Sequence, residues 1–129
     1  MFDNNIFIKD SCRNIYQDEK VLGYELQTNI PYYRGIPLSM VNEILVKEND
    51  EIVKREIIQC SLDKKQWFTL NEMTTVTSYK WEFGYPLYIR VNKADGLAGG
   101  IHDIELTVSI RTAYIPVPII GVMARKVVI

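Results

Sequence analysis

The sequence predicts an all-β fold, a two-layer antiparallel β-sandwich of immunoglobulin-like or jelly-roll-like type with little helix. Two observations predict it. Apolar residues recur with a period of two, most clearly where Ile104, Leu106, Val108 and Ile110 alternate with four polar residues. Turn-forming residues recur at roughly ten-residue intervals, which divides the chain into several short strands. A small barrel is the alternative architecture, because the same pattern is compatible with it.

The second half of the chain contains the clearest strands. Apolar and polar side chains alternate in Pro86–Val91, and the following segment, Asn92–Gly100, contains three glycines. Glycines continue a strand poorly and supply turn conformations. We therefore expect a hairpin between Pro86–Val91 and the alternating strand Ile104–Arg111, and a final strand over Met123–Ile129.

The first half has a weaker pattern. The acidic segment Glu48–Glu51 is expected to form the tip of a hairpin between Val41–Val46 and Ile52–Cys60. One or two helical turns over Ser39–Lys47 are the alternative for the first arm, and we prefer the strand. Further strands are expected over Val21–Ile30, Trp67–Leu70 and Thr75–Phe83, the last being rich in β-branched and aromatic residues.

Size and charge restrict the class of protein. A chain of 129 residues is expected to form one domain, residues 1–129. Its 15 basic and 16 acidic residues give a net charge of −1 without a basic stripe, so no nucleic acid partner is expected. The longest apolar stretch, Tyr114–Ala124, is interrupted by two prolines and a glycine and is too short to span a bilayer. No membrane association is therefore expected.

The expected compartment is the cytoplasm. The first residues do not combine a basic region with a long apolar one, as a secretory signal does. Cys12 and Cys60 lie far apart and without the spacing of a metal or redox motif. We expect both to be reduced, buried or half-buried thiols, with a single disulfide as the alternative.

No recognisable catalytic set is present in the sequence. The single histidine, His102, begins an alternating strand and is expected to hydrogen-bond a neighbouring turn. A metal site needs further histidine, cysteine or clustered carboxylate ligands at suitable spacing. Neither a nucleophile-elbow motif nor a phosphate-binding loop occurs, and the glycine segment precedes a strand rather than a helix. We assign no catalytic residue and no cofactor to this chain.

Two aromatic segments are the candidate functional features. In the first, residues 30–37, two tyrosines and an arginine stand between two prolines, a composition typical of an interface or ligand-binding loop. In the second, residues 79–86, four aromatic residues alternate and share one face if the segment is extended, which also suits a core strand. The predicted interface or pocket-wall residues are Tyr32, Tyr33, Arg34, Gly35, Pro37, Trp81, Phe83 and Tyr85. A third segment, residues 114–118, adds Tyr114 at the start of a proline-stiffened loop.

Three stretches resemble a known family. They are residues 31–39, PYYRGIPLS; residues 80–84, KWEFG; and the region from GIHD at 100–103 to RTAYIPVP at 111–118. In this order and spacing they resemble the small β subunit of bacterial C-glycoside deglycosidases. The resemblance extends from the first residues nearly to the last.

The resemblance implies a two-subunit enzyme. Such a complex cleaves the C–C bond between a sugar, already oxidised to its 3-keto form, and an aromatic aglycone such as a flavonoid. The family's larger α subunit is expected to be a (β/α)-barrel that holds a divalent metal, expected to be manganese, and the acid–base residues. The β subunit is expected to be a β-sandwich that packs on it and lines one side of the aglycone pocket.

Two other classes of function fit the same residues. One is a free-standing β-sandwich module that binds carbohydrate or aromatic ligands by stacking its exposed rings on them. The other is a structural interaction domain without a link to glycosides. A binding module is expected to bind its ligand alone, whereas an accessory subunit requires its larger partner.

Overall fold

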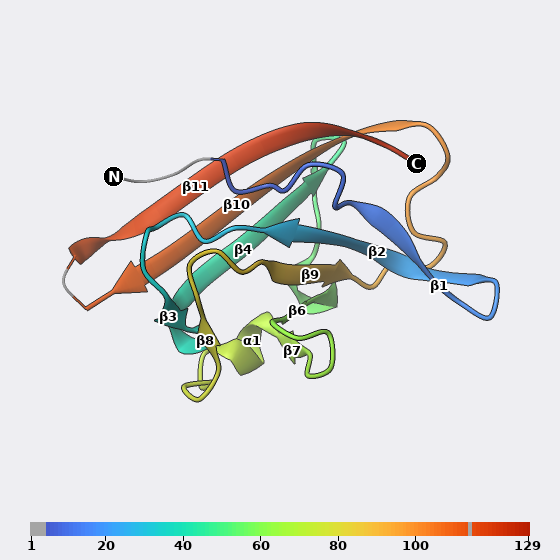
Figure 1. Ribbon diagram of the computed structural model, residues 1–129. Coiled ribbons are helices and arrows are strands. Elements are labelled where there is room, and N and C mark those ends of the chain that lie inside the picture. Colours follow the sequence, from blue (N-terminus) through green and yellow to red (C-terminus); the bar gives the residue numbers. More distant parts are fainter. Residues whose placement is uncertain (1–4, 114) are drawn as a thin grey trace.

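The computed structural model describes residues 5–113 and 115–129 (Figure 1). Eleven strands, two 3₁₀ turns and one short helix are assigned within these ranges. In chain order they are β1 (Arg13–Gln17), β2 (Lys20–Thr28), β3 (Ile36–Pro37), η1 (Leu38–Met40), β4 (Val41–Glu48), β5 (Glu51–Ile52), η2 (Arg55–Ile57), β6 (Ile58–Ser61), β7 (Phe68–Thr69), α1 (Leu70–Met73), β8 (Lys80–Trp81), β9 (Leu87–Val91), β10 (Ile101–Thr112) and β11 (Ile115–Val128).

These strands form two larger sheets and one small ribbon. The strand order is β1-β2-β9-β6-β7 in the five-stranded sheet and β11-β10-β4-β5 in the four-stranded sheet. The ribbon consists of β3 and β8. Every one of these strand pairings is antiparallel. The prediction of an all-β, antiparallel fold with little helix is therefore confirmed.

The core contains the apolar residues that the period-two pattern predicted to be buried. On β10 the apolar Ile104, Leu106, Val108 and Ile110 are completely buried, while the residues between them are partly exposed. Alternate residues of β2, β4, β6 and β9 are buried in the same apolar cluster, so the two sheets share one core. The finer assignment to an immunoglobulin-like or jelly-roll-like sandwich stays a prediction.

A polar bridge joins the two sheets at one end of the core. The hydroxyl of Tyr24 on β2 donates a hydrogen bond of 2.9 Å to Oε1 of Glu48 on β4. The ammonium group of Lys93, just beyond β9, pairs with the other oxygen of Glu48. Glu48 is mostly shielded from solvent, so the two partners compensate for the burial of its charge.

The predicted hairpin between Pro86–Val91 and Ile104–Arg111 is wrong. The first segment forms β9 in the five-stranded sheet and the second forms β10 in the four-stranded sheet. β9 pairs with β2 along one edge and with β6 along the other, so neither edge of β9 is free to pair with β10. The glycine segment instead crosses between the sheets and buries the side chain of Leu97, whose N–H donates to Asn14 Oδ1.

The predicted hairpin around Glu48–Glu51 is partly correct. Strands β4 and β5 pair at Lys47 with Ile52 and at Glu48 with Glu51, so the acidic segment is a hairpin tip. The second arm ends at Ile52, and the chain then turns through η2 to β6, which joins the other sheet. The preferred strand over Val41–Val46 is confirmed by β4, and within Ser39–Lys47 helical backbone is limited to η1.

Two further expected strands are much shorter than predicted. The segment Trp67–Leu70 forms β7 over two residues and then enters α1, which begins at a capping box formed by Thr69 and Glu72. Within Thr75–Phe83 only β8 is a strand. The β-branched and aromatic residues of that segment are mostly exposed, so no sheet face is available to keep them extended.

The last strand is longer than predicted. The expected loop at 115–118 is part of β11, an edge strand in which prolines are tolerated because one side of the backbone makes no ladder hydrogen bonds. Tyr114 lies outside the described residues. Among the described residues, no helix is both long and apolar enough to cross a bilayer.

Candidate functional site

The ribbon of β3 and β8 brings the two predicted aromatic segments together. Ile36 pairs with Trp81 and Pro37 pairs with Lys80. Gly35 makes this approach possible, because a Cβ atom on it would lie 2.8 Å from the carbonyl oxygen of Trp81. Two segments that the sequence analysis treated separately therefore form one surface.

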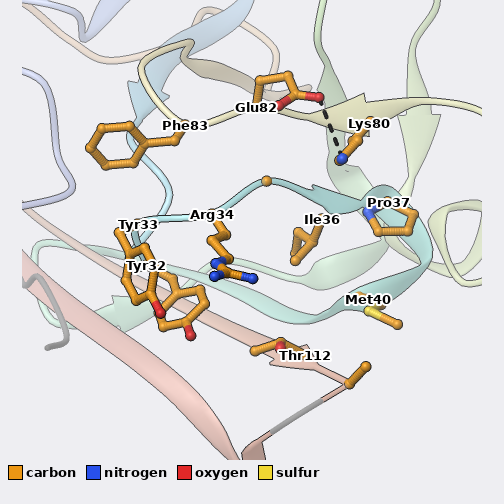
Figure 2. Close-up of a pocket in the computed structure, with 12 residues that line it drawn as sticks. Tyr32, Tyr33, Arg34, Ile36, Pro37, Met40, Lys80, Glu82, Phe83 and Thr112 are labelled. Carbon is orange, nitrogen blue, oxygen red and sulfur yellow. Dashed lines mark ion pairs between the residues drawn. The ribbon is translucent and has the colours of Figure 1, made fainter.

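An open cleft of about 560 Å³ lies along this ribbon (Figure 2). We call it the aromatic cleft. Three parts of the chain line it: the loop before β4, the strand and turn of β8, and the end of β10. The lining residues are Tyr32, Tyr33, Arg34, Gly35, Ile36, Pro37, Met40, Lys80, Glu82, Phe83, Thr112 and Ala113.

Tyr32, Tyr33 and Arg34 form one end of the aromatic cleft. Their side chains gather on the side of the loop that faces Thr112 (Figure 2). The two tyrosine rings lie 4.4 Å apart between centroids, and Arg34 Cζ lies 5.4 Å from the Tyr33 centroid. Tyr32 is buried, whereas Tyr33 is 54% exposed. Tyr32 therefore supports the ring of Tyr33, which together with Arg34 faces solvent.

The electrostatics of this group favour a negative charge near Tyr33. The Tyr32 side-chain hydrogen bond, followed by the positive charge of Arg34, lowers the pKa of Tyr33. The same hydrogen bond, followed by desolvation, raises the pKa of Tyr32. Tyr33 is therefore the more acidic of the two tyrosines, and the Tyr32 hydroxyl donates to its oxygen.

The other side of the aromatic cleft comes from β8 and its turn. Lys80 and Glu82 form an ion pair with 3.8 Å between Nζ and Oε1. Phe83 follows in the turn and is 60% exposed. The ring of Phe83 therefore lies open to contact by a partner or ligand beside the aromatic cleft.

Trp81 does not line the aromatic cleft. Its side chain is completely buried in the core, and its Nε1 donates a hydrogen bond of 2.9 Å to the carbonyl oxygen of Tyr85. The aromatic residues at 79–85 do not share one face, because the chain turns after β8 and Gly84 adopts a φ of +93°. The core alternative is therefore correct for Trp81.

Tyr85 is exposed but lies outside the aromatic cleft. It lines a neighbouring hollow together with Leu62, Lys80 and Glu82. Phe83 and Tyr85 thus each line a different hollow beside the same turn. Of the eight predicted residues, Tyr32, Tyr33, Arg34, Gly35, Pro37 and Phe83 line the aromatic cleft.

Sequence reasoning missed several lining residues. Met40, Thr112 and Ala113 reach the aromatic cleft because the end of β10 lies next to η1. Lys80 and Glu82 stand between the aromatic residues of the second segment, where alternation with the rings gives no sign of a site role. No local pattern in the sequence predicts which of these distant segments meet, because their contacts depend on the packing of the four-stranded sheet.

The remaining candidates have structural roles or no ligand set. His102 contacts the carbonyl oxygen of Ala98 in the neighbouring turn (2.7 Å from Nε2), as predicted, and also Asn49 Nδ2 in the β4–β5 turn (3.0 Å from Nδ1). Cys12 and Cys60 are buried free thiols, and burial raises the pKa of each to about 12. Among the described residues, no three histidine, cysteine, aspartate or glutamate side chains gather as metal ligands.

These features define a class: an antiparallel β protein that presents aromatic rings and an arginine in an open cleft, as binding domains do. Comparison with known proteins gives the family. The family described as C-glycoside deglycosidase beta subunit matches residues 2–114. The chain belongs to this family.

Two relatives agree with this assignment. The C-glycoside deglycosidase beta subunit of Eubacterium cellulosolvens is 26% identical over 101 residues, which are 78% of this chain and 67% of the relative. The 3'-dehydrocarminate deglycosidase beta subunit of a Microbacterium species is 27% identical over 119 residues, which are 91% of this chain and 83% of the relative.

Proposed function

We propose that this chain is the non-catalytic β subunit of a C-glycoside deglycosidase and works with a larger α subunit. The observation that carries the proposal is the family match over residues 2–114. Two relatives named as beta subunits of deglycosidases support the existence of such a partner. The α subunit is proposed to have a (β/α)-barrel fold and to hold a divalent metal, with manganese as the expected ion.

The proposed reaction cleaves the C–C bond between a 3-oxo sugar and a flavonoid-type aglycone. A ketone at C3 acidifies the proton at C2, so a general base can remove that proton. Elimination then breaks the C1–aryl bond while an acid protonates the departing aromatic carbon. The products are an unsaturated keto sugar and the free aglycone.

The described residues of this chain do not fit a divalent metal, since no three suitable side chains gather among them. The metal and the acid–base groups are therefore proposed to lie in the α subunit. The complex is proposed to lie in the cytoplasm, a reducing compartment that suits the free thiols of Cys12 and Cys60.

The aromatic cleft and the β8 turn are the proposed contact surface for the α subunit and the aglycone. Tyr33, Phe83 and Tyr85 expose 54%, 60% and 68% of their surface, and Arg34 is also exposed. Tyrosine and arginine are enriched among the residues that dominate binding energy at interfaces. These exposed rings are available both to pack on a partner and to contact an aromatic substrate.

The test is co-expression of this chain with its candidate α subunit, followed by size exclusion and turnover of a 3-keto C-glycoside. We expect activity only in the joint preparation. The double variant Tyr33→Ala with Arg34→Ala is expected to reduce turnover or complex formation at least tenfold, since it removes two interface-type side chains.

The matched control removes the same two residue types elsewhere. Arg13 and Tyr16 are both exposed on β1, an edge strand of the five-stranded sheet that does not line the aromatic cleft. The variant Arg13→Ala with Tyr16→Ala is expected to leave complex formation and turnover unchanged. Equal effects of the two double variants would contradict the assignment of the aromatic cleft.

A free-standing binding module is the second candidate, favoured by the exposed ring of Tyr33 beside an open cleft. Such rings stack on sugars and aromatic ligands without help from a partner. Calorimetry of the isolated chain with an aromatic C-glycoside separates the two candidates. Binding by the chain alone, together with no effect on the activity of the α subunit, would favour the module.

A further inference from the structure

Arg34 has a different environment from most arginines of this protein. Arg55 pairs with Glu43 at 3.6 Å, Arg111 donates to Asn42 and Ser39, and Arg125 donates to the carbonyl oxygen of Phe7. These contacts hold turns and sheet edges together. Within the part of the chain that the structure describes, Arg34 contacts no carboxylate within ion-pair distance, and its neighbour is the ring of Tyr33.

The aromatic cleft therefore carries a positive charge that its own walls leave uncompensated. Its charged lining residues are Arg34, Lys80 and Glu82. Lys80 and Glu82 pair with each other, so the charge of Arg34 remains. The whole chain is slightly acidic, with a net charge of −1, so this local charge does not follow from overall composition.

The geometry of Arg34 and Tyr33 suits a planar anion. A guanidinium presents several N–H donors in a fixed plane, which matches a carboxylate or a phenolate oxygen better than a neutral hydroxyl. A ring stacked near the same ligand binds its aromatic part. Here the guanidinium lies 5.4 Å from an exposed tyrosine ring, so one aromatic acid can contact both groups at once.

We propose, on the basis of the proposed function, that Arg34 recognises an anionic oxygen on the aromatic aglycone, a carboxylate or an ionised phenol. The exposed ring of Tyr33 contacts the aromatic part of the same aglycone. Arg34 is thus a specificity-determining residue that this subunit contributes to the complex. Tyr32, buried beneath Tyr33, positions the pair.

Recognition by Arg34 would make the complex selective for anionic aglycones rather than raise its affinity for all aglycones. A charge-assisted hydrogen bond is lost when the ligand is neutral, while stacking is retained. The complex should therefore prefer anionic over neutral aglycones, and Arg34 should account for the preference. Lysine at this position keeps the charge but loses the planar donor fork, so Arg34→Lys should retain only part of the preference.

The experiment uses the complex of this chain with its α subunit. Two 3-keto C-glycosides are compared, one with a carboxylate on the aromatic ring and one with a primary carboxamide, which is neutral and of nearly the same shape. We expect Arg34→Gln to reduce the ratio of kcat/KM for carboxylate over carboxamide by about tenfold or more. Turnover of the carboxamide should fall much less than turnover of the carboxylate, so that the ratio reports recognition of the charge separately from any loss of complex formation.

A second substrate pair distinguishes the two kinds of anion. It compares a C-glycosylated phenol with its methyl ether, above and below the pH at which the phenol ionises. A preference for the phenol that grows with its ionisation and depends on Arg34 identifies a phenolate site. A preference confined to the carboxylate pair identifies a carboxylate site.

Arg13→Gln is the matched control, because it removes the same charge from β1. It should leave every substrate ratio unchanged. If Arg34→Gln forms an active complex with unchanged ratios, the inference is overturned and the proposed function stands. If the unmodified chain neither binds an α subunit nor affects its turnover, the proposed function itself fails.

Discussion

At the residue scale, one glycine decides whether the aromatic cleft forms. Gly35 lies against the backbone of β8, where a Cβ atom would approach Glu82 Oε2 to 2.9 Å as well as the carbonyl oxygen of Trp81. The backbone oxygen cannot move without disturbing the ribbon of β3 and β8. A side chain at this position therefore separates the two aromatic segments.

We predict that Gly35→Ala lowers the free energy of unfolding by about 1–3 kcal/mol, because the added methyl group overlaps the carbonyl oxygen of Trp81. Gly99→Ala is the control, since no atom lies within 4 Å of a Cβ at that position. It should change stability by less than about 0.5 kcal/mol. Urea unfolding of both variants checks the prediction, and equal stabilities would contradict it.

At the scale of an element, the β8 turn separates a structural aromatic residue from an exposed one. Trp81 is buried and its indole N–H closes the turn by donating to Tyr85. Phe83, two residues later, is 60% exposed. In a strand, residues 81 and 83 would lie on the same face. Because the chain turns after Trp81, the two aromatic residues have different environments and different roles.

We predict that Trp81→Phe lowers the free energy of unfolding by about 1–3 kcal/mol, because it removes a buried hydrogen bond and core volume. Phe83→Ala should change it by less than about 0.5 kcal/mol and should instead weaken binding to the α subunit. Chemical denaturation and size exclusion of the two variants measure these effects. A strongly destabilised Phe83→Ala would show that Phe83 serves the fold.

At the scale of the whole molecule, the two sheets enclose ionisable groups in their neutral form. Burial, with the nearby charge of Glu48 as a second cause for Cys12, raises the pKa of the Cys12 and Cys60 thiols from 9.0 to about 12. Burial also raises the pKa of Tyr24, and the negative charge of Glu48 raises it further. The folded state therefore retains protons that the unfolded chain releases in alkaline solution.

We predict that the unfolding free energy falls as pH rises from 9 to 12. In this window the unfolded thiols ionise and the folded ones do not, so each thiol contributes a slope of about −1.4 kcal/mol per pH unit. Below pH 9 this contribution is fully present. Urea unfolding at several pH values checks it, with Cys60→Ala expected to have a shallower slope. Equal slopes for Cys60→Ala and the unmodified chain would contradict it.

The sequence by itself determined the class of fold, the family and half of the residues that line the aromatic cleft. Alternation is a local property of each strand, so β10 and its four buried residues were predictable. The loop at residues 30–37 was also identifiable from its tyrosines, arginine and prolines. These features depend on the identity of neighbouring residues and not on which distant segment they meet.

Only the tertiary structure decided the partners of each strand and the shape of the site. β9 and β10 belong to different sheets, and Trp81 belongs to the core, although local patterns favoured a hairpin and allowed a pocket wall. Strand pairing and burial depend on the competition among all segments for backbone hydrogen bonds and for the core. The contact of Gly35 with β8 results from that competition, and it places Arg34 in a cleft with Phe83.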